Sequence, residues 1–362
     1  MEYTISTLGS HSALDVSEGA KKEGFRSLVV AQRGREKVYL GPYKTRKRGK
    51  KEIGVIDELL LLGKFNEILT PGNREFMKKR NCIFVPNRSF AVYVGYEGIE
   101  KEFDIPVFGN KYLLRAEERD VPKNQYYLME KAGVRTPKQF KSPKDINKLS
   151  IVKVSEAKRT YERAFFLARN FEEYTERSEA LIKSGKTTRE QLQKAKIEEY
   201  IVGAQFNLNF FYSPVHEELE LLGVDTRRQT NLDGYLRMPA DVQLDLLKMQ
   251  QPSTIEVGHI ACTLRESLLE QVYEVGENFV RAVQKEYKNG IIGPFALQGA
   301  FVEEEGEKFV CFDVSLRMPG SPGTRFTPYS EYMFRESISF GRRIAMEIKD
   351  AQKAKMMDKI TT

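Results

Sequence analysis

A predicted hairpin in the last third of the sequence carries two polar side chains within strands that are otherwise apolar. Residues 295–302 and 308–316 have the composition of strands, and Glu305-Gly306 between them fits a two-residue turn. Such a turn fixes the register of the two strands, so that Gln298 faces Asp313. The same register pairs Val302 with Phe309.

This pairing brings a carboxylate and an amide oxygen side by side on one face of the hairpin. Mg²⁺ prefers hard oxygen ligands, usually one or two from the protein together with phosphates. Gln298 and Asp313 are therefore candidate metal ligands. The alternative is a buried pair in which the amide simply hydrogen-bonds the carboxylate.

Other motifs that could perform chemistry are weaker. Residues 184–188 (Ser-Gly-Lys-Thr-Thr) resemble the end of a P-loop, but the first glycine of that motif would fall at Ala180, and the stretch joins two predicted helices. The three histidines, His11, His216 and His259, lack the spacing of metal ligands, and there is no Gly-x-Ser-x-Gly motif. The sequence therefore favours neither a P-loop nor a hydrolytic triad.

His11 lies in a turn whose residues suit anion binding. Gly9-Ser10-His11-Ser12 connects a predicted strand at 3–8 to a predicted helix at 13–23. The sharp turn needs the glycine, and the free N–H groups at the start of the helix can face an anion. His11 is thus the histidine for which we expect a functional role.

The elements that position these residues begin with an α/β region. Strands and helices alternate over the first hundred residues, with a second strand at 27–30 and later apolar runs at 53–62 and 82–85. This alternation predicts a parallel sheet with helices on its faces.

The pattern changes after about residue 110. It predicts a helix at 125–132, then a small α+β unit, similar to a lid, with a helix at 171–183. The strands expected for this region are 151–154, 164–168, 197–202 and 206–212. The last third combines the hairpin with helices at 267–287 and 336–357.

The composition is that of a globular protein. The 362 residues are 41% hydrophobic and 30% charged, and no apolar run approaches the roughly 20 residues of a membrane span. The first residues lack the pattern of a secretory signal. Three cysteines, odd in number and far apart, fit free thiols in a reducing compartment. We therefore expect a cytoplasmic protein without a membrane partner.

The net charge of +7 fits either a nucleic-acid binder or a pocket for small anions. Most basic residues alternate with acids, as on a solvated helix face. A denser cluster at 44–51 suits an exposed loop or the attraction of a phosphorylated substrate. It lacks the interleaved aromatic residues of stacking platforms, so we expect no nucleic-acid partner.

Six stretches together resemble one known family, the PurP family of ATP-grasp ligases. They are 7–14 (Thr-Leu-Gly-Ser-His-Ser-Ala-Leu), 197–203 (Ile-Glu-Glu-Tyr-Ile-Val-Gly), 211–214 (Phe-Tyr-Ser-Pro), 265–268 (Arg-Glu-Ser-Leu), 293–295 (Gly-Pro-Phe) and 341–345 (Gly-Arg-Arg-Ile-Ala). The resemblance runs over nearly the whole length. It implies an α/β and α+β architecture, with an ATP-grasp fold preceded by a Rossmann-like pre-ATP-grasp domain.

The resemblance also suggests domain boundaries. We expect the pre-ATP-grasp domain at 1–110 and the ATP-grasp domain at 111–350, followed by the end of the C-terminal helix at 351–362. Within the ATP-grasp domain, the lid-like subdomain would cover about 125–205 and the larger subdomain about 206–350.

The activity implied by the resemblance is the ATP- and formate-dependent formylation of 5-aminoimidazole-4-carboxamide ribonucleotide (AICAR). The product would be 5-formamidoimidazole-4-carboxamide ribonucleotide (FAICAR), formed through formyl phosphate in the synthesis of IMP. The expected cofactors are ATP and Mg²⁺ or Mn²⁺, the substrates are AICAR and formate, and a homo-oligomer is expected.

By the same resemblance, residues of this chain take roles in three groups. The substrate-binding residues would be His11, Ser89 and His259. The ATP-binding residues would be Lys153, Lys158, Arg159, Glu198, Glu199, Tyr200, Ile201 and Gln229, with Lys153 reaching the phosphates and 198–201 meeting the adenine. Gln298 and Asp313 fall on the metal positions, and no catalytic residue is assigned.

The sequence departs from the family at several of these positions. A glycine-rich phosphate loop is replaced by 155–163, which contains no glycine. Gln229 stands for a glutamate, His259 for an asparagine and Asp313 for a glutamate, and 318–324 replace an acidic glycine-rich stretch. Two alternatives therefore stay open. One is a diverged ligase that joins another carboxylate and amine; the other is a nucleotide-binding regulatory protein with little catalysis.

Overall fold

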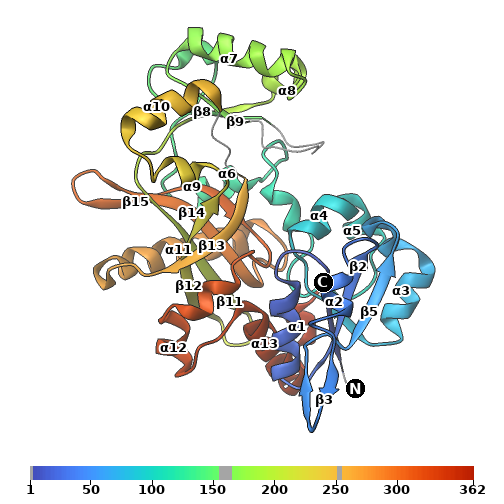
Figure 1. Cartoon of the computed structure of the whole chain (residues 1–362). Helices are drawn as coiled ribbons and strands as arrows, with labels where there is room; N and C mark the ends of the chain where they lie inside the picture. Colours follow the sequence, from blue (N-terminus) through green and yellow to red (C-terminus); the bar gives the residue numbers. More distant parts are fainter. Residues whose placement is uncertain (1–2, 155–164, 251–254) are drawn as a thin grey trace.

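The computed structural model describes residues 3–154, 165–250 and 255–362 of the chain (Figure 1). Its strands form three larger sheets and one short hairpin. Among the described residues, no helix is long and apolar enough to cross a membrane.

The N-terminal region is built on a four-stranded parallel sheet, which confirms the prediction from the alternating pattern. The strand order is β5 (Glu58–Leu62), β2 (Arg26–Gln32), β1 (Thr4–Leu8) and β6 (Cys82–Phe84). The helices of this region are α1 (Ala13–Lys22), α2 (Lys37–Leu40), α3 (Pro71–Lys78), α4 (Arg88–Val94) and α5 (Tyr96–Lys101). The carboxyl end of β1 leads directly into the His11 turn.

The basic cluster at 44–51 is an exposed two-stranded hairpin of β3 (Arg46–Arg48) and β4 (Lys51–Ile53), not a simple loop. It lies at the lower edge of the N-terminal region in Figure 1.

The lid-like unit predicted from the middle of the sequence is a four-stranded antiparallel sheet, drawn at the top of Figure 1. Its order is β7 (Gln139–Phe140), β10 (Lys196–Glu199), β8 (Ser150–Lys153) and β9 (Phe165–Ala168). The helices α6 (Gln125–Lys131), α7 (Phe171–Lys183) and α8 (Arg189–Gln193) belong to the same stretch of chain. The strand expected at 197–202 is shorter than predicted, because β10 ends at Glu199 and leaves Tyr200 and Ile201 beyond it. The strand expected at 206–212 was wrongly assigned to this unit, because β11 (Ala204–Ser213) pairs in the central sheet and β7 is the fourth strand of the lid sheet.

The central element is a five-stranded antiparallel sheet. Its order is β13 (Glu256–Cys262), β12 (Glu218–Gln229), β11 (Ala204–Ser213), β14 (Gly293–Glu303) and β15 (Glu307–Ser315). The remaining helices are α9 (Leu232–Tyr235), α10 (Ala240–Met249), α11 (Leu269–Glu286), α12 (Tyr329–Phe334), α13 (Phe340–Ala354) and α14 (Met357–Ile360).

Apolar side chains from both faces of this sheet enter hydrophobic cores. On one face, Phe210 and Phe295 pack with Phe279 of α11. On the other, Phe211 packs into a cluster that contains Ile344 of α13 and Val16 of α1. Helix α13 thus connects the central sheet to the N-terminal region.

The β14–β15 hairpin corrects one part of the sequence prediction and confirms another. The turn contains residues 304–306, so Val302 faces Lys308 and not Phe309. A β-bulge then adds one residue to β15, because Gly299 faces Cys311 whereas Gln298 faces Asp313. The predicted Gln298–Asp313 pair is therefore present, although its register depends on the bulge at Phe312 and not on a two-residue turn.

Candidate functional site

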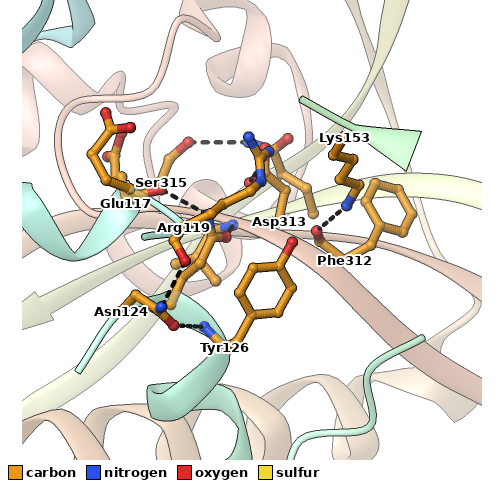
Figure 2. Close-up of polar contacts among 12 residues, drawn as sticks. Glu117, Arg119, Asn124, Tyr126, Lys153, Phe312, Asp313 and Ser315 are labelled. Carbon is orange, nitrogen blue, oxygen red and sulfur yellow. Dashed lines mark hydrogen bonds and ion pairs between the residues drawn. The ribbon is translucent and has the colours of Figure 1, made fainter. Parts of the chain in front are cut away.

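The residues predicted to bind ATP phosphates begin with Lys153, the last residue of β8. Its ammonium group lies 2.7 Å from Glu198 Oε2, and both side chains are almost fully buried. Lys153 Nζ also donates to the carbonyl oxygen of Phe312, at 3.0 Å (Figure 2). That carbonyl belongs to the bulge residue, so the bulge in β15 supplies a contact for the lysine.

Glu198 lies in β10, opposite Ile151 of β8. Its other carboxylate oxygen accepts a hydrogen bond from the Tyr126 hydroxyl of α6. The charge of Lys153 is thus balanced inside the protein, which a buried ammonium group requires. Tyr126 had no role in the sequence prediction, although it ties α6 to the lid sheet.

The other predicted ATP-binding residues lie in two places, one at the end of β10 and one at the end of β12. Glu199 ends β10, and its carboxylate lies 2.6 Å from Lys148 Nζ. The N–H groups of Glu199 and Tyr200 donate to backbone oxygens of the lid, while Ile201 follows in the segment that leads to β11. Gln229 ends β12, and its N–H donates to Asp233. Lys158 and Arg159 lie outside the described residues.

The predicted metal ligands face two arginines. Gln298 Oε1 accepts from the Arg227 guanidinium, and Gln298 Nε2 donates to Ser315 Oγ at 3.0 Å. Asp313 Oδ1 lies 3.6 Å from Arg119 Nη2, and these two residues are adjacent in Figure 2. Two elements far apart in sequence, the segment before α6 and strand β12, thus supply positive charge to the pair.

These donors fit a Mg²⁺ ion that takes most of its ligands from phosphates and water. The oxygens available on neighbouring strand positions are one carboxylate from Asp313, the amide of Gln298 and the hydroxyl of Ser315. Among the described residues, no group of three His, Cys, Asp or Glu side chains could hold a metal without other ligands. The protein alone therefore provides only part of a coordination shell.

A further group of charges borders Asp313. Glu117 Oε1 accepts from the Leu316 N–H at 2.7 Å and lies 3.5 Å from Arg317 Nε. Its second oxygen accepts from Arg88 of α4, at 3.1 Å. Burial lowers the pKa of the Arg317 guanidinium, which Glu117 partly counteracts. Glu117 thus fixes the end of β15 to the N-terminal region.

The edge strand β13 continues the site beyond Gln298. Arg227, which holds Gln298, also lies 3.0 Å from Glu256 Oε2 through its Nε. Glu256 Oε1 lies 2.8 Å from His259 Nε2. The other ring nitrogen of His259 lies 3.1 Å from Asp225 and 3.2 Å from Ser321 Oγ. Both imidazole nitrogens are therefore engaged by side chains of the protein.

The electrostatics of this cluster favour charged forms. Burial alone would lower the pKa of His259, but hydrogen bonds and charge from Asp225 and Glu256 raise it to about 9. Burial alone would raise the pKa of Glu256, but His259 and Arg227 bring it down to about 2, with a contribution from His11. At neutral pH, His259 is thus an imidazolium and Glu256 a carboxylate.

His11 meets this cluster across the segment 319–321. A methyl group placed on Gly320 would lie 3.4 Å from His11 Nδ1 and 4.0 Å from Glu256 Oε1, so the two side chains face the same point. Ser12 Oγ donates to the Pro319 carbonyl at 2.6 Å. The His11 turn and β13 are therefore joined through this segment.

Ser89, the remaining predicted substrate residue, lies in the first turn of α4. Its hydroxyl donates to Ser10 Oγ at 2.6 Å. Asn87, which caps α4 by accepting from the Phe90 N–H, also donates to the His11 carbonyl at 3.2 Å. Ser89 is thus held beside the His11 turn.

Several of the described candidates form a line across the molecule, joined by polar contacts, by one strand pair and by close approach. Lys153 contacts Phe312, which adjoins Asp313, and Asp313 pairs with Gln298 in the hairpin. From Gln298 the line continues through Arg227, Glu256 and His259 to the His11 turn. Lys153 and Glu198 lie at one end, the predicted substrate residues lie at the other, and the predicted metal pair lies between them. Gln229 is the exception among the predicted ATP residues, because it faces Glu256 in the pairing of β12 with β13.

Sequence reasoning missed four residues of this line: Arg119, Tyr126, Arg227 and Glu256. All four partner residues that were identified, and for Arg119, Tyr126 and Arg227 no local spacing connects the two members of the pair. The sequence of β12 did contain a pattern that could have identified Arg227. Its carboxyl end carries Asp225 and Arg227 two positions apart, so a strand assignment there would have placed both on one face.

Comparison with known proteins gives full-length matches. The family described as "Domain of unknown function (DUF1297)" matches residues 173–362, and the one described as "Protein of unknown function (DUF1246)" matches residues 5–140. The 5-formaminoimidazole-4-carboxamide-1-(beta)-D-ribofuranosyl 5'-monophosphate synthetase of Methanopyrus kandleri is 40% identical over 362 residues, covering 100% of this chain and 95% of the relative. The same-named protein of Methanocaldococcus jannaschii is 38% identical, covering 99% and 95%.

Solved structures agree with these matches. The IMP biosynthesis protein PurP from Thermococcus kodakaraensis has a TM-score of 0.74 and 29% identity, covering 99% of this chain and 100% of that chain. The N5-carboxyaminoimidazole ribonucleotide synthetase from Thermotoga maritima has a TM-score of 0.56 and 13% identity, covering 96% and 76%. The second likeness concerns the fold alone, which is the ATP-grasp fold expected from the sequence. This chain therefore belongs to the PurP family, together with the 5-formaminoimidazole-4-carboxamide ribonucleotide synthetases that it matches over its full length.

Proposed function

We propose that this chain is an ATP-dependent carbon–nitrogen ligase that formylates AICAR with formate, giving FAICAR for the synthesis of IMP. The observation that carries the proposal is the 40% identity, over the full chain, to a protein named as a synthetase of this product. The predicted metal pair lies between Lys153, predicted to meet the ATP phosphates, and the predicted substrate residues of the His11 turn, and this arrangement supports the same reaction.

In this reaction the γ-phosphoryl group of ATP passes to formate, and ADP leaves. The amine of AICAR then attacks the carbonyl carbon of formyl phosphate, releases phosphate and loses a proton. A Mg²⁺ or Mn²⁺ ion held by Asp313 and Gln298 would supply positive charge to the phosphates. The chain itself would bring Lys153 to the phosphates, and His11 and Ser89 to the ribonucleotide.

Four fixed cations beside this line suit chemistry on phosphates. They are Arg119, Arg227, Arg317 and Lys153, and all four lie within 4 Å of carboxylates that hold their side chains in place. Such preorganised charges stabilise developing negative charge without reorganising during the reaction. Acyl phosphates hydrolyse readily, so exclusion of water from the line would also be required.

The test is a coupled assay of ADP release, with the nucleotide product identified by mass spectrometry. ADP and FAICAR should form together only when ATP, formate, AICAR and Mg²⁺ are all present. ADP release with another carboxylate but not with formate would instead support a diverged ligase. ATP binding in a calorimeter without any ADP release would support a nucleotide-binding regulatory protein. Assembly as a homo-oligomer is a separate proposal, which sedimentation equilibrium would test.

A further inference from the structure

Glu256 is an ionised carboxylate that faces the predicted substrate end of the site. About 29% of its side chain is exposed, and it meets His11 across Gly320. No motif and no resemblance assigned it a role. Its surroundings decide which kind of ligand group it can accept.

Two cations lie against the carboxylate of Glu256. His259 Nε2 lies against Oε1 at 2.8 Å, and Arg227 Nε lies against Oε2 at 3.0 Å. The second ring nitrogen of His259 is engaged by Asp225 and Ser321. His259 therefore has no ring N–H left for a ligand, although the resemblance had suggested that it binds substrate directly.

The lone pairs of Glu256 are less fully used. Each carboxylate oxygen can accept about two hydrogen bonds. His259 takes one acceptor position on Oε1, whereas Arg227 lies near Oε2 as an ion pair without a hydrogen bond, so the exposed edge retains acceptor capacity on both oxygens. A group that meets this edge must donate hydrogen bonds, because a second anion would face a fixed negative charge.

We propose that Glu256 is a specificity-determining residue, which selects a substrate bearing N–H donors and rejects one bearing a carboxylate at the same place. This inference rests on the proposed function, since AICAR carries both an amine and a carboxamide on its imidazole ring. The carboxamide NH₂ and the ring amine can both donate to a carboxylate. The corresponding 4-carboxylate ribonucleotide presents an anion where the carboxamide stands.

In this arrangement His259 and Arg227 are positioning residues. His259 holds one oxygen of Glu256 and is itself held by Asp225, while Arg227 holds the other oxygen and Gln298. The charged groups that surround His259 are Asp225 and Arg227 from β12, Glu256 from β13 and His11 from the N-terminal turn. Through Arg227, the carboxylate of Glu256 is therefore connected to Gln298 of the predicted metal pair.

The experiment measures the affinities of AICAR and of 5-aminoimidazole-4-carboxylate ribonucleotide by calorimetry, with wild type, Glu256→Gln and Glu256→Asp. Wild type should prefer AICAR by at least about 30-fold, which corresponds to about 2 kcal/mol. Glu256→Gln should weaken AICAR binding about 10-fold and reduce the preference to about threefold or less, because a neutral amide also donates to a carboxylate. Glu256→Asp keeps the charge and should keep most of the preference.

Two controls show whether a loss of AICAR affinity comes from the Glu256 side chain itself and not from damage to the fold. Glu270→Gln, an exposed carboxylate at the start of α11, should leave both affinities unchanged. ATP affinity and the thermal midpoint should be retained in Glu256→Gln. An unchanged ratio of the two nucleotide affinities in Glu256→Gln, with AICAR still bound by wild type, overturns the inference alone. Absence of AICAR binding to wild type overturns the proposed function, and the inference with it.

Discussion

Substitutions can separate the effect of the buried Lys153–Glu198 ion pair on stability from its effect on ATP binding. Lys153→Met leaves the Glu198 carboxylate buried without its cation, which typically costs about 3–5 kcal/mol of unfolding free energy. ATP affinity should fall in the same variant. The double variant Lys153→Met/Glu198→Gln removes both charges and should regain much of the stability while ATP binding remains weak. Urea denaturation and calorimetry measure the two effects.

Lys101→Met is the matched control, since the Lys101–Glu97 pair is exposed. It should change neither stability nor ATP affinity. Full ATP affinity in the double variant would show that Lys153 only neutralises Glu198 and does not hold phosphate.

Asp313 supplies the single carboxylate of the predicted metal pair. Asp313→Asn should weaken the Mg²⁺-dependent part of ATP binding by about 10-fold or more, that is, by at least about 1.4 kcal/mol. Binding of ATP without metal should change less, because the substitution removes a predicted metal ligand and leaves the positive charge of Arg119 in place. The measurement is ATP affinity at increasing Mg²⁺.

Glu303→Gln, at the exposed end of the same hairpin, is the control for Asp313→Asn and should leave the Mg²⁺ dependence intact. If the Mg²⁺ titration of Asp313→Asn superimposes on that of wild type, Asp313 is not a ligand of the metal.

His259 makes the stability of the protein depend on pH. The pKa of His259 rises from 6.5 to about 9 in the folded chain. Its contribution to the free energy of unfolding is therefore fully present below pH 6.5 and is lost as the pH rises to about 9. The loss amounts to about 3 kcal/mol. Urea denaturation at pH 6 and at pH 9.5 should therefore show a drop for wild type that is much smaller for His259→Gln. His216→Gln should retain the drop; if it also abolishes it, the histidine responsible is not His259.

At the level of residues, the sequence predicted positions that lie on one hairpin but not partners that come from different elements. Gln298 and Asp313 share a hairpin, so local pairing found them, and even an error in the turn was cancelled by the bulge at Phe312. Arg119 and Arg227 reach the same pair from segments with no local relation to it. Such contacts are set by tertiary packing, which no short-range spacing encodes.

At the level of elements, the crossing of α1 and α13 depends on two glycines. A methyl group on Gly341 would lie 2.1 Å from the Asp15 carbonyl oxygen, and one on Gly19 would lie 2.1 Å from the Gly341 carbonyl carbon. Gly341→Ala must therefore push the helices apart, at a cost that we expect to exceed about 2 kcal/mol. Gly72→Ala in α3 meets no atom within 4 Å and should be neutral or stabilising. Comparison of the two unfolding free energies checks the prediction; equal values would show that α1 and α13 are not closely packed.

The strands that carry Asp225, Arg227 and His259 were the elements least visible in the sequence. The last five residues of β12 are Asp-Thr-Arg-Arg-Gln, so the alternation of apolar and polar residues that marks a strand is lost there. Strand β13 has exposed apolar residues at Val257 and Ile260, with the polar side chain of His259 largely covered between them. Both strands line the site, and the need for polar groups on that face overrides the usual pattern.

At the level of the whole molecule, the candidate site draws on all three sheets. His11 and Ser89 come from the N-terminal region, Lys153 and Glu198 from the lid sheet, and Gln298 and Asp313 from the central sheet. The parallel and α+β regions were predictable from the order of elements, and the resemblance supplied their combination as an ATP-grasp fold. The domain boundaries at about residues 110 and 350 remain a prediction.

Because the two ends of the line belong to different regions, the two ligands should stabilise the protein through separable contacts. A ligand that binds only the folded state adds about 2.7 kcal/mol at 100 times its dissociation constant. ATP with Mg²⁺, and AICAR, should each raise the thermal midpoint of wild type in a fluorescence melt. His11→Ala should lose most of the shift caused by AICAR and keep that caused by ATP, whereas Lys153→Met/Glu198→Gln should show the reverse. If both variants lose both shifts equally, the two ligands do not occupy opposite ends of the line. If AICAR shifts neither wild type nor variant while ATP does, the chain binds ATP for a different amine acceptor, and the His11 end accommodates that acceptor instead.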